Sequence, residues 1–336
     1  MARTKPHGEN VGLLRCDLHT HSVFSDGTYT PSEIIAEAKR LGLIVALTDH
    51  NTAAGLPEFM DAAQKLGVTA VPGVEFSTEH KGKELHLLGL FVLPEHYAAV
   101  ERMVKEQHVL KEISNMELVE RLNQAGYLID YAKVKRRNPN GNANRAHMAA
   151  ELLEQGYVTS IREAFDTIVR DNGGFYVPPS QLQLIDVIKE LRHIGVLPVL
   201  AHPLQELTER ELRELLPNAI EAGLAGLETM HSSYTPEMIS LAEKIAAEFS
   251  LLSSGGSDFH GSVKPDIFLG TGKGWLCIPT EIYSNLLAAW KCRHLYSAHR
   301  NIAQQNSYAI PVGAIEQAVQ KAKSKYFRRR RLIDSV

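Results

Sequence analysis

The sequence is poor in cysteine and has no long apolar run, and each of these absences excludes a class of protein. Only Cys16, Cys277 and Cys292 occur in 336 residues, too few and too scattered for a disulfide framework or a zinc knuckle. No apolar segment approaches the roughly 20 residues that span a bilayer, and residues 1–10 are too polar for a signal peptide. We therefore expect a cytoplasmic protein with reduced thiols that makes no contact with membranes.

Two further absences bear on function. The formal net charge is -3, so no overall field attracts the chain to duplex nucleic acid, and none is expected as a partner. A basic run at 321–331 is either a solvated tail or an electrostatic contact for RNA. The motif Gly-x-Ser-x-Gly is absent, which disfavours a serine nucleophile and a covalent intermediate.

Histidine, in contrast, is abundant, and its positions carry the main signal. Of the 15 histidines, His19 and His21 flank one residue at the end of a predicted strand, so both side chains point to the same side and can bind one metal ion. Asp26 lies a few positions further along the same loop, and other residues of this kind follow or lie within later apolar runs: His50, Glu75, His86, His202, Asp258 and His260. Carboxylates and imidazoles grouped at strand ends are the donor set of a multinuclear metal site.

The hydrophobic pattern alternates between strands and helices. Strands are predicted at 11–18, 43–48, 68–76, 84–92, 196–201, 224–230 and 250–254. The alternation predicts an α/β fold with a parallel sheet closed as a barrel, and places the site at the carboxyl ends of the strands.

The alternation is interrupted once, and this defines the expected organisation of the chain. From 94 to 183 the pattern indicates helices with almost no strand. We expect a barrel formed by 11–93 and 184–295, a helical insertion at 94–183 that caps the site, and C-terminal helices with a basic tail at 296–336.

Together these motifs resemble the PHP (polymerase and histidinol phosphatase) superfamily. The resemblance rests on Asp17-Leu18-His19-Thr20-His21, Thr48-Asp49-His50-Asn51, Gly73-Val74-Glu75, Ala201-His202-Pro203 and Ser257-Asp258-Phe259-His260. It implies a distorted (β/α)7 barrel that holds two or three divalent metal ions (Mn, Fe or Zn).

The resemblance also implies how the ligands are divided. One ion would be held by His19, His21, Glu75 and Asp258; a second by Asp26, His50 and His260; and Glu75 would bridge to a third, completed by His86 and His202. Asp17 and Asp49 are expected to assist catalysis from behind the ligands, as acceptors for imidazole N–H groups.

Within the superfamily, Asn144-Arg145-Ala146-His147 and the segment His231 to Glu237 resemble a free-standing bacterial branch of nucleoside 3′,5′-bisphosphate phosphatases and a 5′→3′ exoribonuclease. We therefore predict a metal-dependent phosphoesterase that uses metal-activated water on a small phosphorylated substrate. That substrate is a terminal phosphomonoester of a nucleotide, a nucleoside bisphosphate or a short RNA end. Arg145, His147 and His231 are the predicted phosphate contacts, with His231 also a candidate proton donor. The stretch 105–116 lacks the arginines that this branch implies.

Three other functions remain open at this point. A histidinol-phosphate phosphatase would use the same chemistry on a cationic substrate, which should require an additional carboxylate in the pocket. A metal amidohydrolase is disfavoured because no lysine suitable for carbamylation is evident at a strand end. A non-catalytic, metal-stabilised PHP module is disfavoured because the ligand set is complete.

Overall fold

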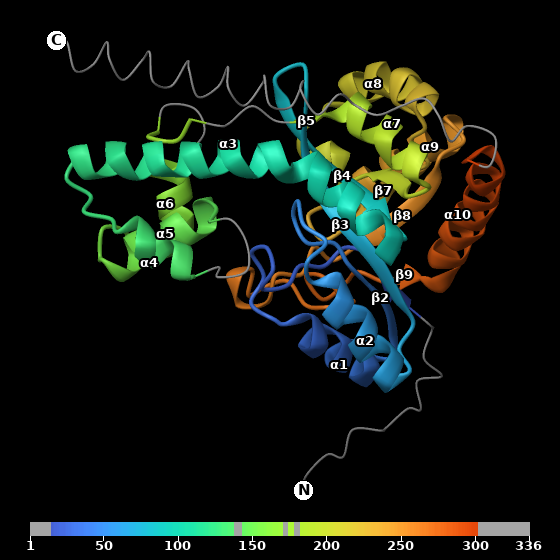
Figure 1. Cartoon of the computed structure of the whole chain (residues 1–336), viewed down its shortest axis with the longest axis horizontal. Helices are drawn as coiled ribbons and strands as arrows, with labels where there is room; N and C mark the ends of the chain where they lie inside the picture. The colour runs from blue at the N-terminus through green and yellow to red at the C-terminus, as the bar shows by residue number, and fades with distance from the viewer. Residues whose placement is uncertain (1–14, 138–142, 171–173, 178–181, 302–336) are drawn as a thin grey trace, which may run out of the picture.

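The centre of the fold is one sheet that curls into a nearly closed barrel (Figure 1). The computed structural model describes residues 15–137, 143–170, 174–177 and 182–301. In spatial order the strands are β8 (Leu252–Gly256), β7 (Gly226–His231), β6 (Leu197–Leu200), β4 (Lys83–Leu90), β3 (Ala70–His80), β2 (Leu43–Leu47), β1 (Arg15–Asp17) and β9 (Ile278–Pro279). The predicted α/β barrel is confirmed.

The barrel closes where the chain leaves β1 and β8. The Leu18 amide donates a hydrogen bond to the Gly255 carbonyl at 3.0 Å, and the Asp258 amide donates to the His19 carbonyl at 2.9 Å. The start of β1 is instead paired with β9 in an antiparallel arrangement. The seam between β1 and β8 therefore lies beside the predicted ligands.

Among the strands that the sequence predicted, the expectation of a parallel sheet is wrong for one. β4 pairs antiparallel with both β3 and β6. The reason is the connection from β3, which consists of Lys81 and Gly82 with φ angles of 50° and 78°. Such a turn builds a hairpin, whereas a parallel crossover needs about a dozen residues. His86 consequently lies within the ladder, opposite Ser77, and not at the carboxyl end of a strand.

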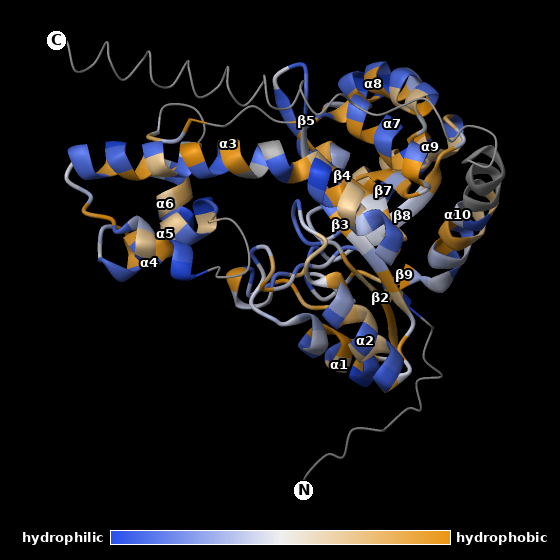
Figure 2. Cartoon of the chain, viewed as in Figure 1, coloured by the Kyte–Doolittle hydropathy of each residue, from blue (hydrophilic) through white to orange (hydrophobic). Residues whose placement is uncertain are grey.

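Helices α1 (Pro31–Leu41), α2 (Leu56–Leu66), α7 (Leu184–Ile194), α8 (Glu209–Ala222) and α9 (Pro236–Glu248) contribute to one large core with the outer face of the sheet. In Figure 2 the hydrophobic residues are concentrated on the strands and on the helix sides that face them. Strand side chains alternate, so Val45 packs toward these helices while Ala46 packs into a second core. Helix α10 (Thr280–Asn301) contributes Leu286 to that second core.

Four helices between β4 and β5 form a distinct layer beside the barrel (Figure 1): α3 (Tyr97–Gln124), α4 (Tyr131–Arg136), α5 (Arg145–Glu154) and α6 (Ile161–Thr167). They share a core of their own, which includes Leu118, Leu122 and Met148. The chain returns through β5 (Leu182–Gln183), which pairs with β3. In the described part of the chain, no helix has the length and apolar character needed to cross a membrane.

Candidate metal centre

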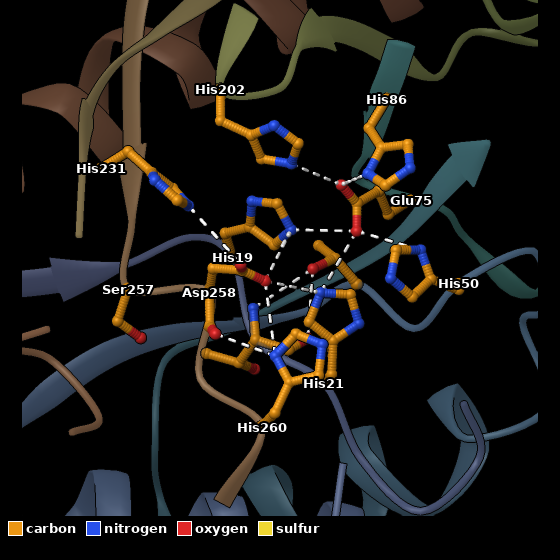
Figure 3. A network of polar contacts seen from close by, with 12 residues as sticks. His19, His21, His50, Glu75, His86, His202, His231, Ser257, Asp258 and His260 are labelled. Carbon is orange, nitrogen blue, oxygen red and sulfur yellow. Dashed lines mark hydrogen bonds and ion pairs between the residues drawn. The ribbon is translucent and has the colours of Figure 1, made fainter. Parts of the chain in front are cut away.

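The predicted ligands converge at one end of the barrel (Figure 3). Parallel strands end at a common rim, and this brings together residues that are distant in the sequence. The loops after β1, β2, β6 and β8 and the strands β3 and β4 supply His19, His21, Asp26, His50, Glu75, His86, His202, Asp258 and His260. Among them, the candidate ligand atoms of His21, Asp26, His50 and His260 all lie within 4.8 Å of one another.

One oxygen of Glu75 faces three imidazoles. Glu75 Oε2 lies 3.1 Å from His19 Nε2, 3.2 Å from His21 Nε2 and 3.2 Å from His50 Nδ1. Two ligands that each lie about 2.1 Å from a common ion are separated from one another by about 3.0–3.4 Å in octahedral or tetrahedral geometry. The observed separations therefore match those between ligands of one metal ion.

The other oxygen of Glu75 faces a second pair of imidazoles. Glu75 Oε1 lies 2.9 Å from His86 Nδ1 and 3.1 Å from His202 Nε2. The antiparallel course of β4 makes this possible, because it carries His86 past β3 next to Glu75. The two oxygens of one carboxylate thus address separate groups of donors, as in a bridging ligand.

Two aspartates complete the cluster. Asp258 Oδ1 lies 3.3 Å from His21 Nε2 and 3.4 Å from His260 Nδ1. Asp26 Oδ1 lies 3.2 Å from His260 Nε2, and Asp26 Oδ2 lies 3.9 Å from His50 Nε2. Within each of the three ligand groups that the family resemblance implied, the side chains therefore contact one another.

Several of these polar atoms are buried without a hydrogen-bond partner: His19 Nε2, His21 Nε2, His50 Nδ1 and Glu75 Oε2. An unsatisfied buried polar group costs about 1–3 kcal/mol, and that cost is removed when a cation accepts the lone pairs. Imidazole nitrogens with carboxylate oxygens suit Mn, Fe and Zn. The residues present therefore fit a divalent metal centre.

The pKa values of the clustered histidines depend strongly on burial and on the neighbouring carboxylates. Burial lowers the pKa of His21, but Asp258 and Glu75 outweigh burial and raise that pKa to about 9. The carboxylates of Glu75 and Glu84 likewise overcome burial and raise the pKa of His86 to about 10. Burial dominates at His50 and lowers its pKa to about 3. Without metal, the cluster therefore combines protonated and neutral imidazoles around its carboxylates.

The backbone at the site is unusual in two respects. A Cβ at Gly256, the last residue of β8, would lie 2.1 Å from His19 Cβ, so only glycine lets the two segments pass. Non-glycine residues with positive φ include Asn51, His202 and Asp258, at 53°, 24° and 58°. Such conformations cost free energy and persist where surrounding contacts impose them, often at functional sites.

Asp17 and Asp49 require a correction. They were predicted to accept imidazole N–H groups, but their partners are hydroxyl and backbone groups. Asp17 accepts from the Ser257 amide at 2.8 Å and the Gly270 amide at 2.7 Å. Asp49 accepts from the Ser22 amide at 2.7 Å and the Ser25 hydroxyl at 2.7 Å. Both carboxylates fix the loops that carry the ligands.

The acceptor for an imidazole N–H is instead Glu228, which the sequence analysis missed. Its Oε1 lies 3.2 Å from His19 Nδ1, and both side chains are fully buried. The available signal was a carboxylate in the middle of an apolar strand.

His231, predicted to contact phosphate or donate a proton, lies at the end of β7 beside the cluster. Its Nδ1 accepts from the Ser233 amide at 3.2 Å and faces the Gln205 amide nitrogen at 3.1 Å. These donors place the ring proton on Nε2, which is buried and points to Asp258 at 3.6 Å (Figure 3). The geometry therefore presents an N–H donor to the site.

A cavity of about 220 Å³ connects the cluster to the helical layer. Its walls include Asp26, His50 and His86 of the cluster and Lys111 and Arg145 of the helical layer. Glu84, which is not a predicted ligand, also lines the cavity with its carboxylate. The sequence analysis did not identify it.

His147, a predicted phosphate contact, is not among the residues that line this cavity. Its Nδ1 accepts the Asn144 amide at 3.1 Å, and its own amide donates to Asn144 Oδ1 at 3.1 Å. The ring therefore forms a capping box at the start of α5.

Comparison with known proteins gives a consistent result. Residues 17–176 match the PHP domain family. The chain is 31% identical over 246 residues to a 5′-3′ exoribonuclease of Haemophilus influenzae, covering 73% of this chain and 89% of that protein. It is 31% identical over 258 residues to a phosphoribosyl 1,2-cyclic phosphate 1,2-diphosphodiesterase of Eggerthella lenta (73% and 94%). It is also 31% identical over 252 residues to a 3′,5′-nucleoside bisphosphate phosphatase of Chromobacterium violaceum (74% and 88%).

A solved structure agrees with these relatives. A protein of Bifidobacterium adolescentis described as a metal-dependent phosphoesterase superposes with a TM-score of 0.74 at 28% identity, covering 84% of this chain and 97% of that one. A barrel with a histidine and carboxylate cluster at its rim has the donor set that a metal-dependent hydrolase requires. The chain belongs to the PHP family and is a metal-dependent phosphoesterase.

Proposed function

We propose that the protein hydrolyses a terminal phosphomonoester of a small nucleotide that carries a second phosphate, as in a nucleoside 3′,5′-bisphosphate or a short RNA end. The observation that carries the proposal is the cavity shared by candidate ligands and two cationic side chains, Lys111 and Arg145. One phosphate would lie against the metal centre and the other against these cations. The names of the exoribonuclease and bisphosphate phosphatase relatives support this substrate class.

The cations are suited to a phosphate. Within the described residues, Lys111 has no ion pair, and burial lowers the pKa of its amine. A substrate anion would supply the missing partner. Arg145 lies over the ring of Tyr176 at 4.7 Å and near that of Phe165 at 5.8 Å, which limits its guanidinium to few orientations. Arg145 also begins α5, where backbone N–H groups favour an anion.

The proposed mechanism divides the chemistry among the residues of the cluster. The ligands would be His19, His21, Asp26, His50, Glu75, His86, His202, Asp258 and His260. Bound divalent ions lower the pKa of water and offset charge on phosphoryl oxygens. His231 Nε2–H would donate a hydrogen bond to a phosphoryl or leaving oxygen, and Arg145 would orient the second phosphate. We propose that the helices at 94–183 cap the site and exclude a duplex.

A second candidate deserves a direct test because of Glu84. A carboxylate in the cavity is what a cationic substrate such as histidinol phosphate would require, and Glu84 lines the cavity beside His86. The test is kcat/KM with Mn²⁺, Fe²⁺ or Zn²⁺ for a nucleoside 3′,5′-bisphosphate, a mononucleotide, a 5′-phosphorylated oligoribonucleotide, a cyclic ribose phosphate and histidinol phosphate. We expect the bisphosphate or the oligoribonucleotide to lead. Preference for histidinol phosphate or the cyclic ester would overturn the proposal.

A further inference from the structure

Glu228 is a buried carboxylate of β7 that holds two parts of the candidate metal centre at once. We propose that Glu228 is a positioning residue: it fixes the tautomer of His19 and the backbone of His202, and thereby couples the two sets of ligands on either side of Glu75. This inference rests on the proposed ligand set and concerns metal binding, independently of which substrate is cleaved.

The first contact determines which nitrogen of His19 can bind a metal. Glu228 Oε1 and Oε2 lie 3.2 Å and 3.4 Å from His19 Nδ1. A carboxylate only accepts hydrogen bonds, so the ring proton is drawn to Nδ1. Nε2, 3.1 Å from Glu75 Oε2, is then the nitrogen whose lone pair would hold a metal ion shared with that carboxylate. The opposite tautomer would place a proton where the metal must bind.

The second contact acts on the backbone of another ligand. Glu228 Oε2 accepts the His202 amide at 2.8 Å. His202 has a φ of 24°, a conformation that needs support from its surroundings. Its Nε2 lies 3.1 Å from Glu75 Oε1. One carboxylate therefore supports a ligand on each side of the Glu75 bridge.

Both partners of Glu228 are donors, and this makes glutamine an informative replacement. A glutamine has nearly the same shape but exchanges one acceptor oxygen for an NH₂ group. That group either opposes a donor or draws the His19 proton to Nε2, which disables the ligand. Aspartate changes the reach of the side chain but keeps two acceptor oxygens. A role in positioning predicts that Glu228→Asp binds metal better than Glu228→Gln, whereas a role in filling space predicts the reverse order.

The experiment compares metal binding by four variants (Glu228→Gln, Glu228→Asp, Ser254→Ala and His86→Ala) and wild type after complete metal removal. Stoichiometry is measured by elemental analysis after gel filtration, affinity by competition with a chelator, and coordination by the visible absorption of bound Co²⁺. Ser254→Ala is the matched control, because Ser254 pairs with Glu228 across the sheet and its buried hydroxyl has no hydrogen-bond partner. Circular dichroism verifies that each variant is folded.

We expect Glu228→Gln to bind metal about 10–100-fold more weakly, with an altered Co²⁺ spectrum. Glu228→Asp should be intermediate and Ser254→Ala should match wild type. His86→Ala should weaken binding only of the ion that His86 would hold. A larger loss of metal affinity in Glu228→Gln than in His86→Ala therefore supports coupling. Metal binding by Glu228→Gln that equals wild type or exceeds that of Glu228→Asp would overturn the inference. Failure of wild type to bind metal would instead overturn the ligand set, and a wrong substrate assignment would leave all these measurements unchanged.

Discussion

Glu75 and His202 are 127 positions apart in the sequence, yet the Oε1 atom of the former lies 3.1 Å from the Nε2 atom of the latter. The contact joins a residue in the middle of β3 to one just beyond β6, with β4 between them in the sheet. The opposite oxygen of the same carboxylate faces His19, His21 and His50. Loss of the Glu75 side chain therefore removes a neighbour from both groups of imidazoles, one at each carboxylate oxygen.

Glu75→Gln is expected to lose metal and activity together. The carboxamide cannot offer two anionic oxygens to two groups of imidazoles. The fall in kcat/KM should therefore exceed roughly 100-fold, the upper end of the effect of removing a residue that only hydrogen-bonds a metal ligand. Elemental analysis and turnover at saturating Mn²⁺ measure the effect. Glu79→Gln, a half-buried position outside the ligand set on the same strand, is the control. Near-normal turnover of Glu75→Gln would contradict the bridging assignment.

Lys111→Met should act on recognition of the second phosphate. A hydrogen bond from a charged group contributes about 1.5–3 kcal/mol, so KM for a nucleoside bisphosphate should rise about 10–100-fold. Hydrolysis of p-nitrophenyl phosphate, which has one phosphate, should change little. The exposed Lys105→Met on the same helix serves as the control. Equal effects on both substrates would show that Lys111 does not read the second phosphate.

Asp17→Asn is expected to lower stability more than it lowers metal affinity. An amide nitrogen in place of one carboxylate oxygen would face a donor, either Ser257 or the Gly270 amide. A buried donor left unpaired costs about 1–3 kcal/mol in the free energy of unfolding. Urea denaturation measures this cost, and a chelator titration measures metal affinity. An unchanged denaturation midpoint would be inconsistent with the hydrogen bonds described.

Metal binding should release protons at pH 8. Carboxylates raise the pKa of His21 to about 9 and that of His86 to about 10 in the absence of metal, whereas a metal requires neutral imidazole. Titration calorimetry in two buffers of different ionisation enthalpy counts the protons. For the metal-free protein, raised histidine pKa values stabilise the fold fully below pH about 6.5, and this contribution is lost as pH rises through about 9–10. Metal uptake without proton release would contradict these pKa directions.

Local pattern was sufficient to find the side chains of the cluster. His19 and His21 share a face because of the period of a strand, and His50 and Asp258 follow apolar runs, so no knowledge of pairing was needed. The direction of β4 was not found in this way, although Lys81-Gly82 is a turn signal that could have indicated a hairpin. The role of Asp17 depends on Ser257 and Gly270, which pattern alone does not connect to it.

The substrate side was harder to predict than the metal side. The stretch 105–116 lacks arginine, so the sequence analysis expected no cation from it. Lys111 of α3 nevertheless lines the cavity. His147 occupies a motif position, but the cap of α5 uses its ring. Helix phase and capping are set by the packing of the helical layer, and sequence spacing does not specify them.

The seam between β1 and β8 also has a consequence for the order of assembly. Its hydrogen bonds join Leu18 to Gly255 and His19 to Asp258, so the earliest and latest ligands in the sequence lie on opposite sides of one junction. During synthesis His19 and His21 leave the ribosome long before His260 exists. The metal centre cannot be complete until most of the chain has emerged, and ions that bind earlier can meet only partial sets of donors. Complete metal binding is thereby linked to a contact of very large sequence separation, whose loop-closure entropy is large.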